Sequence, residues 1–168
     1  MALLIIATIN GIHLCEAEDN GWRPCGHTLQ GHHVTSVIAR EGVILAGTTD
    51  GIYRSDDLGL TWQEASQGLT QRHVRWMAFH PDISDFEFAG TEPATIFISR
   101  DGGQSWHAAD EGLGTPWKDT RVERVVHLGD ELFAVLDNGK LLVAPQDTLA
   151  WQPLLPGIEN ATAITRMV

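Results

Sequence analysis

The stretch Ser55–Trp62 (S-D-D-L-G-L-T-W) decides how this sequence is interpreted, because it recurs further along the chain as Ser99–Trp106 (S-R-D-G-G-Q-S-W). Both copies fit the pattern S-x-D-x-G-x-[TS]-W. Each is followed by a related tail, Glu64–Leu69 in one copy and Ala108–Leu113 in the other. A motif repeated together with its flanks indicates a repeat architecture. The defining residues are Ser55, Asp57, Gly59 and Trp62 in the first copy and Ser99, Asp101, Gly103 and Trp106 in the second.

Two weaker copies follow when tryptophan is used as the anchor. Cys15 precedes Trp22, and Ala144 precedes Trp151, by the spacing that separates Ser55 from Trp62. The spacing of the four anchors predicts units of roughly 40 residues, the period of a β-propeller blade. We expect repeats at roughly 2–30, 31–70, 71–114 and 115–160.

The unit that can be followed throughout predicts four short strands. They are Val34–Ala39, Val43–Thr48, Gly51–Ser55 and Thr61–Ala65. Glycine-containing turns separate apolar runs here, and such turns are strong hairpin signals because glycine accepts a positive φ. The fold predicted is therefore an all-β propeller of four-stranded antiparallel blades, with four repeats in the single domain 1–168.

The two ends of the chain have complementary patterns. The apolar run Ala2–Ile9 aligns with the second strand of a repeat, so we do not interpret it as a signal peptide, and the chain is expected to be soluble and cytoplasmic. The segment 161–168, with Ala163–Val168 as its strand, is expected to add the innermost strand to the first blade and so protect its edge. Three alternatives remain open: a four-bladed monomer, an eight-bladed ring made by a homodimer, and a fragment of a longer propeller.

The repeated motif resembles the Asp-box of the bacterial neuraminidase (BNR) repeat, which occurs in sialidases, some glycosidases, sortilin-type receptors and photosystem assembly factors. The resemblance implies that the motif is a structural hairpin, with Asp57 and Asp101 accepting backbone N–H bonds and the tryptophans packing between sheets. It does not extend to sialidase chemistry. Trp22–Pro24 (W-R-P) lacks the Arg-Ile-Pro motif, and the only tyrosine, Tyr53, fits a packing role.

Composition restricts the partners. The chain has 22 acidic residues against 11 lysines and arginines, a formal net charge of −11. Phosphate backbones and anionic lipids require clustered basic residues, so neither nucleic acid nor a membrane is expected as the main partner. Two cysteines do not indicate a disulfide framework or a zinc site, and no cofactor is expected.

Candidate ligand-binding residues lie in loops that a propeller brings to one rim of its channel. His33 and His73 hold equivalent repeat positions, and Asp50 and Glu92 follow second strands. The two histidines with Asp50 or Glu92 offer enough donors for a metal, but capping of the inner strands by hydrogen bonds is the preferred interpretation, and no metal is predicted.

The longest connection adds Trp117, Asp119 and Arg121 to the rim. Trp117 either stacks on a ligand or packs on a neighbouring blade. Arg75, Arg124 and Arg166 belong to innermost strands and either line the channel or pair with Glu123.

Two function classes follow. The first is a non-catalytic binding or scaffolding propeller for a protein or carbohydrate ligand. The second is a glycosidase-like hydrolase that uses two of the carboxylates Glu92, Asp119 and Glu123. Short loops favour the first class.

Overall fold

The computed structural model of the chain describes residues 2–112, 117 and 119–165. The described strands form four antiparallel sheets in chain order. The first sheet contains β1 (Leu3–Thr8), β2 (Gly11–Glu18) and β3 (Gly21–Thr28); the second contains β4 (Val34–Arg40), β5 (Val43–Thr48), β6 (Gly51–Ser55) and β7 (Gln63–Glu64); the third contains β8 (His73–Phe79), β9 (Glu87–Glu92), β10 (Ile96–Ser99) and β11 (His107–Ala108); the fourth contains β12 (Val122–Leu128), β13 (Glu131–Leu136), β14 (Leu141–Pro145) and β15 (Gln152–Pro153).

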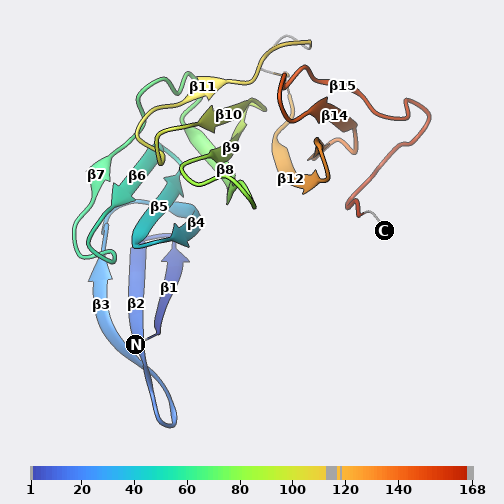
Figure 1. The fold of residues 1–168 in the computed structure, drawn as a ribbon. Coiled ribbons are helices and arrows are strands. Elements are labelled where there is room, and N and C mark those ends of the chain that lie inside the picture. The colour runs from blue at the N-terminus through green and yellow to red at the C-terminus, as the bar shows by residue number, and fades with distance from the viewer. Residues whose placement is uncertain (1, 113–116, 118, 166–168) are drawn as a thin grey trace.

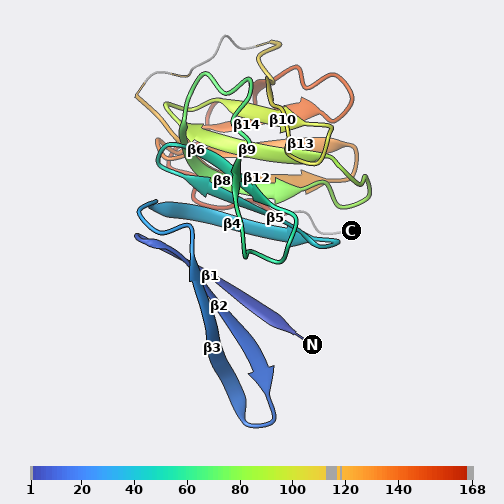
Figure 2. The same cartoon turned by 90° about the vertical axis from the view of Figure 1, so that its left-hand side faces the viewer.

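The sheets follow one another along an arc from the N-terminal to the C-terminal end (Figure 1). In the perpendicular view the second, third and fourth sheets stack as layers, and the β2–β3 hairpin extends away from the stack (Figure 2). The propeller-like all-β fold agrees with the sequence prediction, and the strands of the second sheet agree closely with those expected. Only the predicted strand Thr61–Ala65 is shorter, because just Gln63 and Glu64 pair with β6.

The Asp-box turns are closed by the side chains that define them. The Asp57 carboxylate accepts hydrogen bonds from the backbone N–H (2.8 Å) and hydroxyl (2.6 Å) of Thr61, which together with Ser55 lower the pKa of Asp57 to about 2. The Ser55 hydroxyl in turn accepts the N–H of Gly59 at 2.8 Å. The second box repeats these bonds through Asp101, Ser105, Ser99 and Gly103. Each box therefore satisfies its own polar groups and has a structural role.

Three apolar clusters fill the spaces between adjacent sheets. Each contains a tryptophan that packs back on the preceding sheet. The Trp62 indole donates to the hydroxyl of Thr28 in β3 at 3.0 Å, and the Trp106 indole donates to the Ala65 carbonyl at 2.9 Å. Trp106 and Trp151 are only 1% exposed.

The structure corrects the alignment of the first repeat. In place of an Asp-box turn, β2 and β3 continue as a long hairpin in which Ala17 pairs with Trp22 and His13 with His27. Because Tyr53 pairs with Glu64 at the equivalent place, Cys25 and not Trp22 corresponds to Trp62. The spacing between Cys15 and Trp22 equals that between Ser55 and Trp62 and therefore suggested the wrong alignment. In the first sheet, residues that would form the Asp-box turn pair instead as a continuation of β2 and β3.

The predicted closure of the first blade does not form within the described residues. Among the described residues the first sheet has three strands, so a four-stranded first blade is not confirmed. Residues 163–165 form no strand, and 166–168 lie outside the described residues. The preceding segment bonds to the fourth sheet instead, from Leu154 N–H to Leu141 (2.9 Å) and from Ala161 N–H to Gly139 (3.2 Å). The described part of the chain has no helix of the length and hydropathy needed to cross a membrane.

Candidate ligand-binding rim

We define the rim as the turns β5–β6, β9–β10 and β13–β14 together with the segments that lead into β8 and β12. Backbone hydrogen bonds join each turn to a segment: Gly51 N–H donates to Arg72 O at 2.7 Å, Ala94 N–H to Thr120 O at 2.8 Å and Asp137 N–H to Arg121 O at 3.1 Å. These bonds fix polar side chains from separate repeats at one end of the sheets.

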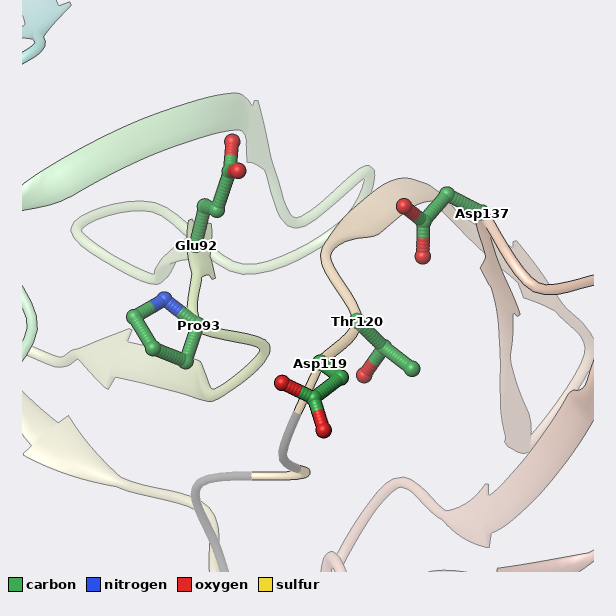
Figure 3. A pocket seen from close by; sticks show the side chains of 5 residues that line it. All are labelled: Glu92, Pro93, Asp119, Thr120 and Asp137. Carbon is green, nitrogen blue, oxygen red and sulfur yellow. The ribbon is translucent and has the colours of Figure 1, made fainter.

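A pocket of about 510 Å³ lies in the rim, lined by Glu92, Pro93, Asp119, Thr120 and Asp137. Figure 3 shows the Asp119 side chain between Pro93 and Thr120, with Glu92 and Asp137 on either side. Three carboxylate side chains from three segments thus line one hollow. Asp119 is held at φ 56°, a left-handed conformation that aspartate tolerates better than most residues.

The acidic character of the pocket is only partly neutralised. The Glu92 carboxylate lies 3.8 Å from both His73 Nδ1 and Arg75 Nε, and Asp137 lies 3.8 Å from Arg121 Nε. The Arg121 guanidinium bonds more closely to Glu123, at 2.6 Å. Within the described ranges, Asp119 has no ion-pair partner. The pocket therefore favours a cationic group.

Asp50 belongs to a different cluster. Its carboxylate bonds to Arg72 Nε at 2.6 Å, and the same guanidinium bonds to Glu64 at 2.7 Å. Both bonds raise the pKa of Arg72 and hold its side chain. Sequence reasoning missed Arg72, although it directly precedes His73 in a rim segment, and it missed Pro93 and Thr120 as pocket residues.

The two predicted histidines differ in environment. His33 is exposed, and its carbonyl accepts the N–H of Thr49 at 3.1 Å. Burial lowers the pKa of His73. Among the described residues, no three His, Cys, Asp or Glu side chains are placed to hold a metal ion together. The structure therefore gives no support to a metal site that includes His33 and His73.

Trp117 has a packing contact in the structure. Its ring lies edge to face with the Trp151 ring, with 6.3 Å between the ring centroids. Its backbone N–H donates to the Ala94 carbonyl at 2.8 Å. The side chain is half-buried against the core between the third and fourth sheets. A ligand contact for Trp117 remains a prediction.

Three of the remaining candidates, Glu123, Arg75 and Tyr53, have packing or pairing contacts. Glu123 pairs with Arg121, and Arg75 approaches Glu92. Arg124 lines a separate hollow beside Ala161 and Thr162. Tyr53 packs between the first and second sheets, with its hydroxyl 2.9 Å from His32 Nε2. Arg166 lies outside the described residues.

A model of the BNR/Asp-box repeat matches residues 97–108, which include the whole of the second box, Ser99–Trp106. No curated protein matches the chain significantly. The recognition of an Asp-box repeat from the two motifs is thus confirmed.

Solved structures share the fold at low sequence identity. YCF48 bound to D1 peptide matches with a TM-score of 0.63 and 15% identity, over 90% of this chain and 50% of that one. An ancestral GH74 enzyme matches with a TM-score of 0.69 and 15% identity, over 95% of this chain and 25% of that one. A nidogen/laminin complex matches with a TM-score of 0.60 and 14% identity, over 90% of this chain and 60% of the other. The chain spans half or less of the first two proteins.

Proposed function

Because the chain carries a BNR/Asp-box repeat in a propeller-like all-β fold, we propose that it is a non-catalytic binding module for a protein partner. The rim pocket receives a lysine or arginine side chain from an extended segment of that partner. The observation that carries the proposal is that Glu92, Asp119 and Asp137 line the same hollow.

The chemistry of the pocket supports a cationic ligand over an anionic one. A guanidinium or ammonium group that enters it exchanges water for carboxylate oxygens, and hydrogen bonds between charged groups are stronger than neutral ones. The net charge of −11 adds a long-range attraction for a basic partner. Asp119 is the most available acceptor, since Glu92 and Asp137 already face arginines.

The structural neighbours support a protein partner in general terms. Of those described above, one contains a bound peptide and another is a complex of two proteins. These partners belong to the neighbouring proteins, and the present chain has its own rim residues. The proposal for this chain therefore depends on its pocket.

The test compares two fluorescent peptides, one alternating arginine with serine and the other alternating glutamate with serine. We expect the arginine peptide to bind by fluorescence anisotropy and the glutamate peptide not to bind. Asp119→Asn is expected to weaken the first interaction about tenfold, a loss of about 1.4 kcal/mol. Added salt should weaken it further.

The control is Asp82→Asn, which removes the same charge from an exposed position in the segment between β8 and β9. It should leave the affinity within twofold of the unaltered chain. Equal losses in the two variants would show that the peptide senses only net charge, and the pocket proposal would then be wrong.

One observation supports the hydrolase alternative, since Glu92 and Asp119 line the same pocket. A glycosidase needs an acid and a base or nucleophile on opposite sides of a sugar. Glu123 is less suited to this role, because it pairs with Arg121. Release of nitrophenol from aryl glycosides, abolished by Asp119→Asn, would establish hydrolysis and displace the binding proposal.

A further inference from the structure

β1 differs from its counterparts in the other sheets by having a free edge. Its register on β2 pairs Thr8 with Gly11, as Thr48 pairs with Gly51 in β5, and both threonine hydroxyls donate to the paired glycine carbonyl at 2.9 Å. β1 is therefore equivalent to β5, β9 and β13. Each of those lies between two strands, whereas β1 is paired only with β2 among the described residues.

The outward face of the first sheet is also uncovered. The register makes Ile6 equivalent to Ala46, Ala89 and Ala134, each of which is 0% exposed against the preceding sheet. Ile6 is 41% exposed and Leu4, on the same face, is 38% exposed. The position that is buried in the second, third and fourth sheets is thus exposed in the first sheet.

The composition of β1 favours the pairing of this edge with another strand. Its sequence, L-L-I-I-A-T, contains no charge and no proline. Natural edge strands usually carry lysine, proline or a bulge that prevents pairing with another chain. Without such protection, the free N–H and C=O groups of β1 favour an added strand.

One segment of this chain has the pattern of the strand that is missing. The inner strands begin V-T-S-V-I at Val34, V-R-W-M-A at Val74 and V-E-R-V-V at Val122, and residues 164–168 have the sequence I-T-R-M-V. All three inner strands also share a bulge after the leading valine. In the register of Val34 on Thr48, Ile164 would lie opposite Thr8.

Within residues 2–112, 117 and 119–165, no strand of the same chain pairs with the free edge of β1. Ala161 is bonded to Gly139 in the fourth sheet, and 163–165 are unpaired. In Figure 1 the last described residues lie beside the fourth sheet, at the opposite end of the arc from β1. We propose that residues 164–168 of a second copy pair with the free edge of β1, and that two copies exchange these strands reciprocally.

The exchange gives a two-fold symmetric dimer. Each copy donates one segment and accepts one, so the interface closes without leaving a free β1 edge for further chains. The first sheet of one copy then faces the fourth sheet of the other, which covers Leu4 and Ile6.

Light scattering on a sizing column measures the mass. We expect twice the 18.4 kDa of one chain. Ile6→Glu places a charge in the interface and is expected to yield the single-chain mass. The control is Ile83→Glu, the same substitution at a side chain that is 42% exposed and outside β1, which should leave the dimer intact.

A second arm does not depend on the folding of Ile6→Glu. The chain shortened to end at 162 is expected to be monomeric and to bind a labelled peptide of residues 161–168. A single-chain mass for the full chain would overturn the proposal. So would a dimer that survives both Ile6→Glu and the shortening, because its interface would lie elsewhere.

Discussion

Replacing Trp106 with alanine is expected to lower the free energy of unfolding by about 3–5 kcal/mol, the usual cost of truncating a buried tryptophan. The ring is 1% exposed and lies between the second and third sheets with Leu45, Ile52 and Phe97. Its removal leaves a cavity and also leaves the Ala65 carbonyl without the indole donor. Both losses act on the same boundary between sheets.

Urea unfolding followed by circular dichroism measures this effect without depending on tryptophan emission. The control is Trp22→Ala, because Trp22 is 51% exposed on the β2–β3 hairpin. We expect the control to cost about 0.5 kcal/mol or less. Equal costs at the two positions would contradict the packing described for the second box.

Glu87→Gln is expected to remove a pH dependence of stability that spans about 3 kcal/mol. Glu87 is 2% exposed in β9, and its Oε2 has no hydrogen-bond partner among the described residues. Burial, as the largest cause, raises the pKa of Glu87 to about 7 from 4.5. Each unit of difference between the folded and unfolded pKa is worth about 1.4 kcal/mol.

The sign follows from the raised pKa. Below pH 4.5 the carboxyl is protonated in both states and costs nothing through ionisation. As the pH rises from 4.5 to about 7, the unfolded chain ionises while the folded chain retains its proton, so stability falls. Above pH 7 the loss is complete.

Chemical unfolding of Glu87→Gln and of the unaltered chain at pH 4.5 and pH 8 isolates this contribution. From pH 4.5 to pH 8, the free energy of unfolding of Glu87→Gln should rise by about 3 kcal/mol relative to that of the unaltered chain. Glu131→Gln, at an exposed position in β13, should gain nothing. If the difference in free energy of unfolding between Glu87→Gln and the unaltered chain were the same at both pH values, Glu87 would not be a buried, protonated carboxyl.

The sequence predicted those parts of the fold that depend on local pattern. The turn around Gly51 and the apolar run that begins Val43–Thr48 identify β5 and β6 without reference to distant residues. Asp57 similarly acts within four residues of its own position. Such features follow from backbone preferences that short segments already express.

Features that depend on pairing between distant residues were missed. The offset of Cys25 from Trp22 follows from the ladder of β2 with β3, which spacing alone does not fix. The split of the candidate rim residues into a pocket around Glu92 and a separate Asp50–Arg72 pair depends on which loops meet in space. The buried Glu87 also contradicts its local pattern, since Ile44 and Leu132 hold the equivalent positions.

The direction in which the tryptophans pack has a consequence for folding during synthesis. Trp62 and Trp106 contact sheets that precede them in the chain. Each new sheet therefore emerges from the ribosome with its docking surface already translated. Growth in this order buries apolar surface one sheet at a time, and it limits the exposure that makes slowly pairing β-proteins prone to aggregate.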